Sequence, residues 1–386
     1  MKQQKYIRYI LLPTTLLCLI ASLFCGCSAN SGKISKTGFY FDTMITVTLY
    51  GTRDEKILDD CFSLAGNYEK KLSNTITDSE VSKINEANGQ FVTVSSDTLS
   101  LIKDGIRYGK ISDGTFDITI GTLSDLWNFS EIAETAKSDE NEVDASVVPS
   151  PEKIEAALAH VNYKNIEIKG NQVRLKDPQA KIDLGGIAKG FIADEMRSFL
   201  NKKGITSGVI SLGGNVLTLG KKADHSSYTI GIQKPFSETG TSLGTLNVSD
   251  ASVVSSGIYE RYYRVNGKLY HHILDTSTGY PVENHLYQVT IISDISMDGD
   301  ALSTTCFSLG LKKGMQLVEQ TDGVEAIFVS DDGTITCSSG INRDDSIQFH
   351  ASKTLNAMTL HGVISCYKII FFGHFSAQIP QPVHFS

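Results

Sequence analysis

The order of strand-like and helix-like segments is the feature that most limits how this chain can fold. Short runs rich in β-branched and aromatic residues recur through the sequence, and helical stretches fall between them only irregularly. A parallel sheet would need a helical crossover after nearly every strand, and that strict alternation is absent. The pattern therefore predicts an α+β fold with mixed, largely antiparallel sheets and packed helices; its clearest strand segments are NIEIKG, QVRLKD, SGVISLGG, YTIGIQ and YQVTIIS.

Other segments reveal their type through periodicity or capping. Residues 39–51, FYFDTMITVTLYG, alternate apolar and polar side chains and predict a first strand, and residues 54–72 predict a helix after it. Residues 130–150 are acidic and nearly free of large apolar side chains, so we expect an exposed loop there. The next helix begins with Ser150 as its cap and Pro151 in its first turn, and its buried stripe is Ile154, Ala157, Leu158 and Val161.

Composition and charge limit the class of protein. With 386 residues, of which 41% are hydrophobic, the chain can bury a large core in one or two domains. The formal charge is −8 and no cluster of Lys and Arg stands out in the sequence, so we expect no nucleic-acid partner. The cysteines beyond residue 27 form no C-x-x-C pair and predict no disulfide framework; Cys306, in the apolar run CFSLGL, is expected to be a buried free thiol.

The N-terminus has the pattern of a targeting segment. Three cations precede an apolar run at residues 16–24, which is too short to span a bilayer as a mature helix. The pair Gly26-Cys27 after this run resembles a bacterial lipobox, which predicts that Cys27 becomes a lipidated first residue; a plain signal peptide is the alternative. Removal of the segment lowers the charge from −8 to −11, and residues 28–37 would tether an acidic domain to the extracytoplasmic face of the cell membrane.

The stretch KIDLGGIAKGFIAD, residues 181–194, places two glycines where an apolar strand is expected to turn into a helix. Free N–H groups at the start of that helix, together with Lys189 in its first turn, would favour an anion such as a phosphate. Asp183 would repel a phosphate, so we expect it to bind a neutral group such as a ring N–H or a hydroxyl. The alternative is an ordinary glycine turn beside a solvated lysine, because the spacing matches no established phosphate loop.

A second stretch, MDGDALSTTCFSLG, suggests a cation site. Asp300 is expected to begin a helix, and Ser303 and Thr304 then fall on the same face as its carboxylate. One carboxylate with two hydroxyls suits a hard cation such as Mg²⁺, which also recruits phosphate oxygens. The alternative is that Asp300 only caps the helix.

Two glycine-punctuated stretches, SSGIYERYY and HHILDTSTGYP, are expected to form loops at the site. Turn formation alone explains most of their composition, and a single histidine is usually structural. Beside a metal and a phosphate, however, His272 becomes a candidate base.

These stretches together resemble the FAD:protein FMN transferase family, also called the ApbE family. The resemblance covers residues 39–349 and keeps the family order, in the matching stretches FDTMIT, LSNTITDSEVSKIN, GTFDITIGTLSDLWNF, KIDLGGIAKGFIAD, ISLGGN, IGIQKP, SSGIYERYY, HHILDTSTGYPV and GDALSTTCFSLG. It implies a lipoprotein signal at residues 1–27, a tether at 28–37, one transferase domain at 38–350 and an atypical tail at 351–386.

The resemblance implies a Mg²⁺-dependent reaction in which FAD is cleaved, FMN passes to a Thr or Ser of an acceptor flavoprotein, and AMP leaves. It implies acceptors among membrane redox subunits or exported flavoproteins. His272 and Asp300 are the implied candidates for the base, and the implied metal positions are Gly186, Asp300, Ser303 and Thr304. The implied FAD contacts are Phe41, Thr75, Thr115, Phe116, Asp117, Asp183, Lys189 and Leu274.

Several positions depart from the family pattern. Residues 41–43 replace the common Met-Gly-Thr, and Thr75 stands where a flavin-stacking Tyr is frequent. Ser255 replaces Thr, residues 275–276 replace Asp-Pro, and Ser303 stands where some members carry a second acidic ligand. Two other functions fit the same site: a Mg²⁺-dependent FAD pyrophosphatase that uses water as acceptor, and a flavin-binding lipoprotein without turnover.

Overall fold

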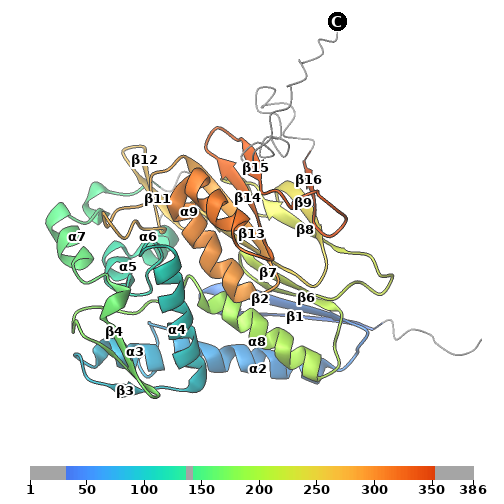
Figure 1. Cartoon of the computed structure of the whole chain (residues 1–386), viewed down its shortest axis with the longest axis horizontal. Helices are drawn as coiled ribbons and strands as arrows, with labels where there is room; N and C mark the ends of the chain where they lie inside the picture. Colours follow the sequence, from blue (N-terminus) through green and yellow to red (C-terminus); the bar gives the residue numbers. More distant parts are fainter. Residues whose placement is uncertain (1–31, 136–141, 353–386) are drawn as a thin grey trace, which may run out of the picture.

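The computed structural model describes residues 32–135 and 142–352 (Figure 1). The predicted signal segment, Cys27 and most of the predicted tail lie outside the described residues. Among residues 32–135 and 142–352, no helix is long and apolar enough to cross a membrane.

The centre of the fold is an eight-stranded sheet in the order β1-β2-β6-β7-β10-β13-β14-β15. Every pairing recorded between neighbouring strands of this sheet is antiparallel. The strands are β1 (Lys33–Tyr40), β2 (Thr43–Tyr50), β6 (Gly208–Leu212), β7 (Asn215–Leu219), β10 (Ser252–Gly257), β13 (Leu286–Ser293), β14 (Val324–Ser330) and β15 (Ile335–Cys337). Together with the helices below, this sheet confirms the α+β prediction.

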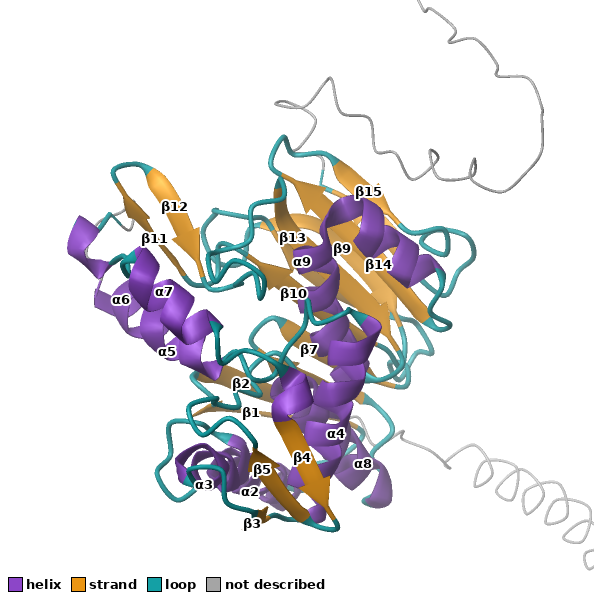
Figure 2. Ribbon diagram, turned by 60° about the vertical axis from the view of Figure 1, so that its left-hand side comes forward, coloured by secondary structure: helices purple, strands orange, loops and turns teal. Residues whose placement is uncertain are grey.

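The helices pack mainly on one face of this sheet or form a separate lobe beside it. In Figures 1 and 2, α2, α8 and α9 lie along the sheet, whereas α5, α6 and α7 form the lobe. The helices are α2 (Glu55–Leu72), α3 (Glu80–Glu86), α4 (Ser96–Ile111), α5 (Gly121–Trp127), α6 (Phe129–Thr135), α7 (Pro151–Leu158), α8 (Ala188–Lys202) and α9 (Ser296–Glu319), with short 3₁₀ turns η1 (Ala145–Val147) and η2 (Tyr163–Asn165).

Three smaller antiparallel units complete the described chain. One three-stranded sheet packs on the second face of the large sheet, one covers the ends of α3 and α4, and a hairpin joins the lobe of α5–α7. They consist of β8 (Tyr228–Gln233), β9 (Ser242–Val248) and β16 (Gln348–Ala351); of β3 (Val92–Thr93), β4 (Ile166–Lys169) and β5 (Gln172–Leu175); and of β11 (Tyr262–Val265) and β12 (Lys268–His271).

The alternation of side chains along the central strands separates two cores. In β13, Val289 and Ile291 pack towards the helices, while Ile292 belongs to the cluster under β8, β9 and β16. In β14, Phe328 faces the helices and Ile327 faces the small sheet. Successive side chains of a strand point to opposite faces of the sheet, so one central strand contributes side chains to both cores. Both faces of such a strand are therefore apolar.

Most sequence predictions of elements are confirmed. The helix expected at residues 54–72 is α2, with Asp54 capping it by accepting a hydrogen bond from the Lys56 N–H. The helix with Pro151 in its first turn is α7, and its expected stripe packs in the lobe core. Cys306 is buried and free, and burial raises the pKa of its thiol to about 12.

Three predictions need correction. Residues 39–51 are not one strand: Phe41 and Asp42 adopt positive φ and form the turn of the β1–β2 hairpin. Residues 130–150, expected to form a loop, contain all of α6 except Phe129, and the whole of η1. Phe129 stacks on Trp127 and so packs the start of this acidic segment against the lobe core. The expected tether at 28–37 overlaps β1, whose pairing with β2 orders the chain from Lys33 onward.

Candidate functional site

The glycine turn lies between an extended segment and α8. Residues 181–184 were expected to be a strand, but they form only an isolated bridge, from Lys181 to Ile120. Two backbone hydrogen bonds still align them with residues 118–121: the Asp183 N–H donates to the Ile118 carbonyl, and the Gly121 N–H donates to the Lys181 carbonyl. The helix expected after the turn is confirmed as α8, which begins at Ala188.

Asp183 and Lys189 hold the glycine turn from its two ends. The carboxylate of Asp183 accepts a hydrogen bond of 2.8 Å from the Gly185 N–H. The Lys189 ammonium donates to the Gly185 carbonyl at 2.9 Å. The expected free N–H groups are therefore mostly engaged, because the Gly185 N–H donates to Asp183 and the Ile187 and Ala188 N–H groups donate to the Leu184 carbonyl. The Lys189 ammonium is the positive group at this turn that would favour an anion.

Helix α9 supplies the acidic residue of the site. It begins at Ser296, one turn earlier than predicted, so Asp300 does not cap its own helix. The Asp300 side chain is buried, and its Oδ2 accepts a hydrogen bond of 2.9 Å from the Gly190 N–H in the first turn of α8. No described residue donates a hydrogen bond to its Oδ1, so that oxygen remains for a ligand.

The two helices cap each other. Asp194 of α8 accepts hydrogen bonds from the N–H groups of Ser296 and Met297 at the start of α9, at 3.1 and 2.9 Å. Asp300 of α9 does the same for Gly190 of α8. Each carboxylate satisfies donors that a helix start would otherwise leave free, so the pair fixes the glycine turn relative to α9.

The hydroxyls of α9 meet a third element, strand β10. Ser256 Oγ lies 2.7 Å from Ser303 Oγ and 3.3 Å from Thr304 Oγ1. A methyl group on Gly186 would lie 3.9 Å from Thr304 Oγ1, so the glycine turn approaches the same point. The structure thus brings the four predicted metal positions into one region. Ser256 was missed as an individual residue, although it lies in the stretch SSGIYERYY; its central strand position was not visible in the sequence.

The loop before α5 forms another wall of the site. The ring of Phe116 is buried, packs edge-on against Tyr108, and lies 3.1 Å from where a methyl group on Gly186 would stand. Asp117 is also buried, and its carboxylate accepts hydrogen bonds from Thr119 and from the Tyr163 N–H. Burial raises the pKa of Asp117, and these hydrogen bonds oppose the rise. Asp117 therefore shapes the loop, which holds Thr115 and Phe116 in place.

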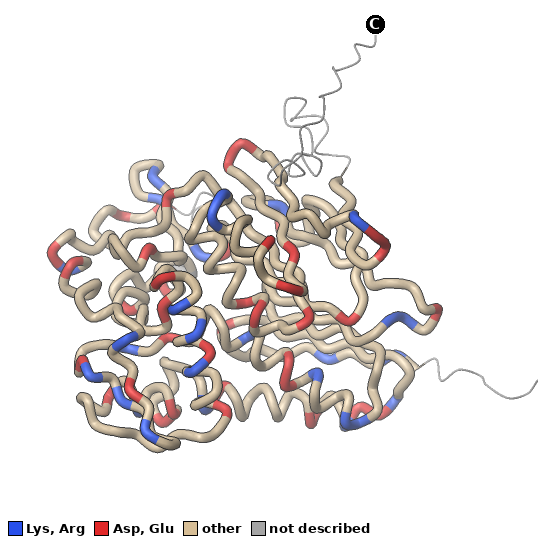
Figure 3. Tube along the Cα trace, in the orientation of Figure 1, with Lys and Arg blue, Asp and Glu red and all other residues tan. Residues whose placement is uncertain are grey.

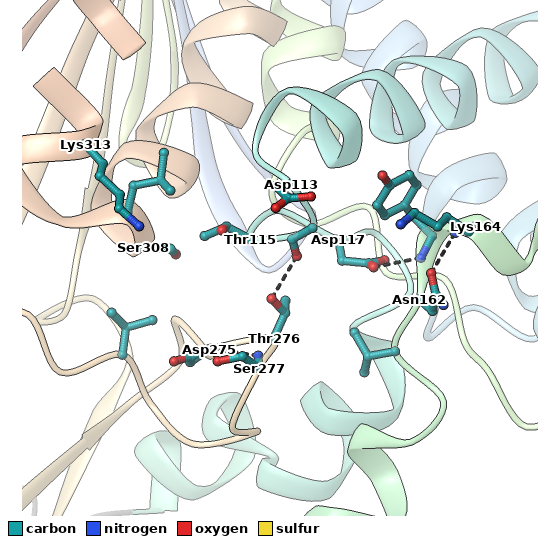
Figure 4. A pocket seen from close by; sticks show the side chains of 15 residues that line it. Asp113, Thr115, Asp117, Asn162, Lys164, Asp275, Thr276, Ser277, Ser308 and Lys313 are labelled. Atoms are coloured by element: carbon teal, nitrogen blue, oxygen red, sulfur yellow. Dashed lines mark hydrogen bonds between the residues drawn. The ribbon is translucent and has the colours of Figure 1, made fainter. Parts of the chain in front are cut away.

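A cavity of about 420 Å³ opens between this loop and α9 (Figure 4). Ser308 of α9 lies one turn beyond Thr304, so the cavity continues the row of side chains that begins at Asp300. Its size is in the range of small-molecule sites. The labelled polar side chains around it are Asp113, Thr115, Asp117, Asn162, Lys164, Asp275, Thr276, Ser277, Ser308 and Lys313.

His272 follows β12 and is held in one tautomer. Its Nδ1 lies 3.2 Å from the Arg261 carbonyl, which can only accept, so Nδ1 carries the proton and Nε2 is free to act as a base. Burial, and then the positive charges of Arg261 and Lys189, lower the pKa of His272 well below its ordinary value. The imidazole is therefore neutral at pH 7, and Lys189 is near enough to affect it.

The remaining implied FAD contacts, Leu274, Phe41 and Thr75, come from three other parts of the fold. Leu274 is buried in the lobe core with Trp127, and the backbone of its loop is held by a hydrogen bond from the Thr276 hydroxyl to the Gly114 carbonyl. Phe41 lies in the β1–β2 turn, where its N–H donates to Glu69. Thr75 is exposed after α2, and its recorded side-chain contact is with Ser73. Within the described residues, no hydrogen bond joins Phe41 or Thr75 to Asp300, Ser303 or Thr304.

The donor set can be tested against Mg²⁺ directly. Asp300, Ser303, Thr304 and the carbonyl of Gly186 offer only oxygen, which is the donor type that Mg²⁺ prefers. No group of three or more His, Cys, Asp and Glu side chains suited to a metal occurs in the described ranges, so a cation here would have one carboxylate and would depend on substrate oxygens. The residues fit Mg²⁺ bound together with a phosphate.

Comparisons with known proteins identify the family of this chain. A model of the ApbE family matches residues 41–328. A relative from Klebsiella pneumoniae (strain 342), named FAD:protein FMN transferase, is 37% identical over 76% of this chain and 88% of its own length. One from Treponema pallidum (strain Nichols), with the same name, is 30% identical over 84% of this chain and 92% of its own.

Solved structures show the same fold. The ApbE protein of Thermotoga maritima is 30% identical and superposes with a TM-score of 0.69 over 85% of this chain and 99% of its own. The apo form of the flavinyl transferase ApbE from Pseudomonas stutzeri is 26% identical, with a TM-score of 0.66 over 86% and 98%. Sequence and structure agree over most of the chain: this protein belongs to the ApbE family.

Proposed function

We propose that this protein is a FAD:protein FMN transferase, which cleaves the pyrophosphate of FAD, joins FMN through a phosphoester to a Thr or Ser of a target flavoprotein, and releases AMP. The name of the relatives that match most of the chain supports this activity. The single observation that carries it is the meeting of the glycine turn at Gly186 with the hydroxyls of α9 beside a cavity of about 420 Å³.

The residues divide the work of phosphoryl transfer, in which a protein contributes position and charge. The Lys189 ammonium, which the Gly185 carbonyl holds at the glycine turn, binds the negative pyrophosphate. The acceptor hydroxyl attacks the phosphorus of the FMN half, and the bond from that phosphorus to the bridging oxygen breaks, so that AMP leaves with this oxygen. Nε2 of the neutral His272 takes the proton of the hydroxyl.

Asp300 is better suited to a cation than to proton transfer, because one of its oxygens already accepts a backbone hydrogen bond. We assign Mg²⁺ to Asp300, Thr304, Ser303 and the Gly186 carbonyl; when bound, it would neutralise the charge of the pyrophosphate and of the departing AMP.

We also propose that lipidation of Cys27 anchors the protein on the extracytoplasmic face of the cell membrane. The lipobox-like pair Gly26-Cys27, which follows an apolar run, supports the anchor.

One incubation separates transfer from the two alternatives. The purified protein is mixed with FAD and Mg²⁺, with and without an acceptor flavoprotein domain, and AMP and protein-bound flavin fluorescence are measured. Acceptor-dependent AMP release with a fluorescent acceptor band is the expected result. AMP release without acceptor would indicate a pyrophosphatase, and FAD binding without AMP release would indicate a flavin-binding protein.

A further inference from the structure

Seven cationic side chains gather at the end of the molecule where the described chain begins, and we call this the lysine-rich end. Figure 3 shows Lys and Arg segments there, at the lower right. None of these side chains forms an ion pair with another described residue. They come from four separate segments, which is why the sequence shows no cluster: Lys33, Arg53, Lys56, Lys202, Lys203, Lys221 and Lys222.

Contacts between these segments show that they share one surface. The Lys33 ammonium lies 5.8 Å from the ring centre of Tyr50, the rings of Tyr50 and Tyr228 are 6.2 Å apart, and the Lys222 ammonium lies 5.9 Å from the Tyr228 ring. The Tyr50 N–H donates to the Ser207 carbonyl, so the segment after α8 lies beside them. Each of the two aromatic rings thus packs against one lysine ammonium.

The acidic residues at this end are engaged in local structure. Asp54 caps α2, Asp224 accepts hydrogen bonds from Ser226, and Asp250 accepts one from the Gly220 N–H. Glu55 lies in the first turn of α2, where the helix dipole favours a negative charge. Asp59 of α2 is paired with Lys36, and Asp60 beside it is a fifth carboxylate at this end. The seven cations outnumber these five carboxylates, so this end is positive on a chain whose formal charge is −8.

We propose that the lysine-rich end lies against the anionic phospholipid headgroups of the membrane; the proposal rests on the Cys27 anchor proposed above. The Gly32 carbonyl accepts a hydrogen bond from the Gly51 N–H, and a methyl group on Gly32 would touch the Arg53 side chain. The chain from Cys27 to Gly32 has five residues and spans at most about 18 Å. A lipid on Cys27 therefore brings this end, and no other, to the bilayer surface.

The charge of the lysine-rich end determines how the domain is oriented at the membrane surface. An acidic domain held beside an anionic surface is repelled, unless the part nearest to the surface is basic. Helix α8 leads away from this surface: its last residue is Lys202, and the glycine turn precedes its first residue, 15 residues or about 22 Å away. Docking by the lysine-rich end thus turns the candidate site away from the lipid and towards acceptor domains.

Hydrogen–deuterium exchange on the full-length lipidated protein tests the proposal. The protein is reconstituted in vesicles of phosphatidylcholine alone and in vesicles that also contain phosphatidylglycerol. Peptides covering residues 201–207 and 219–227 should exchange several-fold more slowly on the anionic vesicles at low salt. High salt should remove the difference, since it screens exposed charges.

Matched charge reversals identify the surface. The triple variant Lys202→Glu, Lys203→Glu, Lys221→Glu should lose the protection on anionic vesicles. A control triple variant, Lys153→Glu, Lys169→Glu, Lys176→Glu, makes the same charge change in α7, in β4 and after β5, and should keep it. Both variants should transfer FMN to a soluble acceptor at the wild-type rate.

Equal exchange on both kinds of vesicle would overturn the proposal, as would protection that survives the Lys202, Lys203 and Lys221 reversals. Failure of the anchor is seen separately, as loss of the protein from the phosphatidylcholine vesicles. In that event, salt-sensitive retention on the anionic vesicles alone would still support the lysine-rich end, and absence of retention would overturn it.

Discussion

Asp300 shows how one side chain can serve both the fold and the chemistry. Its Oδ2 accepts the Gly190 N–H, which fixes α8 against α9, while its Oδ1 has no donor among the described residues. A burial of this kind is costly for a carboxylate unless both oxygens find partners. A cation beside Oδ1 would supply the missing partner, so the same residue would position two helices and hold the metal.

Replacing Asp300 by Asn separates these roles. Asp300→Asn retains an oxygen that can accept the Gly190 N–H, but it removes the negative charge. We expect AMP release to fall by about 100-fold or more, with a small change in melting temperature. The measurement is AMP release across a Mg²⁺ titration, with thermal unfolding as the control for folding. A stable variant that turns over at close to the wild-type rate at every Mg²⁺ concentration would contradict the metal assignment.

The acidic limb of the pH–rate profile should report on His272. A base must be unprotonated, so the rate falls as the pH drops through its pKa; burial and the charges of Arg261 and Lys189 hold that pKa low. Lys189→Met removes one of these charges, so the pKa of His272 should rise and the limb of the kcat/KM profile should move to higher pH. Lys189→Arg keeps the charge and should leave the limb in place. A limb that stays unmoved in Lys189→Met would show that another group controls it.

The close contact between α8 and α9 depends on Gly190, a residue that is not assigned to substrate binding. A methyl group on Gly190 would lie 2.3 Å from the Ser296 carbonyl oxygen, which is backbone and cannot turn away. Only glycine allows the two helix starts to approach closely enough for Asp194 and Asp300 to cap them.

Gly190→Ala should therefore push α8 away from α9. We expect a loss of about 1–3 kcal/mol in the free energy of unfolding, and a larger proportional loss of AMP release, because Gly186 and Thr304 would separate. Gly66→Ala in α2 is the matched control, since its methyl meets only the movable ring of Tyr40. Denaturant unfolding and AMP release measure the two effects, and a Gly190→Ala protein as stable and active as wild type would contradict this account.

The elements show which parts of the fold local sequence determines. Capping residues and apolar periodicity act within one segment, so α2, α7, α8 and the strand β13 were predicted correctly. The β1–β2 turn was missed because Phe41 and Asp42 both adopt left-handed backbone, which is uncommon for Phe and which a single Asp in an alternating segment does not predict. The start of α9 was misplaced since its cap is Asp194, a residue of another helix.

The candidate site likewise contains residues that local sequence predicts and residues that only the tertiary fold brings in. Spacing on one helix placed Asp300, Ser303 and Thr304 together, because neighbours on a helix face are fixed by its geometry. Ser256 could not be identified in this way, since it reaches the cluster from a strand 47 residues earlier in the chain than Ser303. Thr75 and Phe41 were proposed only through the family resemblance, and within the described residues no hydrogen bond joins them to Asp300, Ser303 or Thr304.

At the scale of the whole molecule, the site and the N-terminal end lie at opposite ends of α8. The large sheet begins with β1, which is paired from Lys33 onward, and the glycine turn lies where α8 begins. Loss of the anchor should therefore leave the folded domain and its site intact, and should change only where the protein is found.

Cys27→Ala tests this separation. If Cys27 is lipidated, the variant should leave the membrane fraction, while its FMN transfer to a soluble acceptor should stay within about two-fold of wild type, since Cys27 is none of the residues assigned to the candidate site. The anchor contributes binding to the bilayer through its acyl chains, whereas the lysine-rich end alone offers only salt-sensitive attraction. Fractionation should accordingly be done in low and in high salt, with Ser28→Ala as the control next to the lipidation site. A Cys27→Ala protein that remains in the membrane fraction at high salt would contradict the lipobox interpretation.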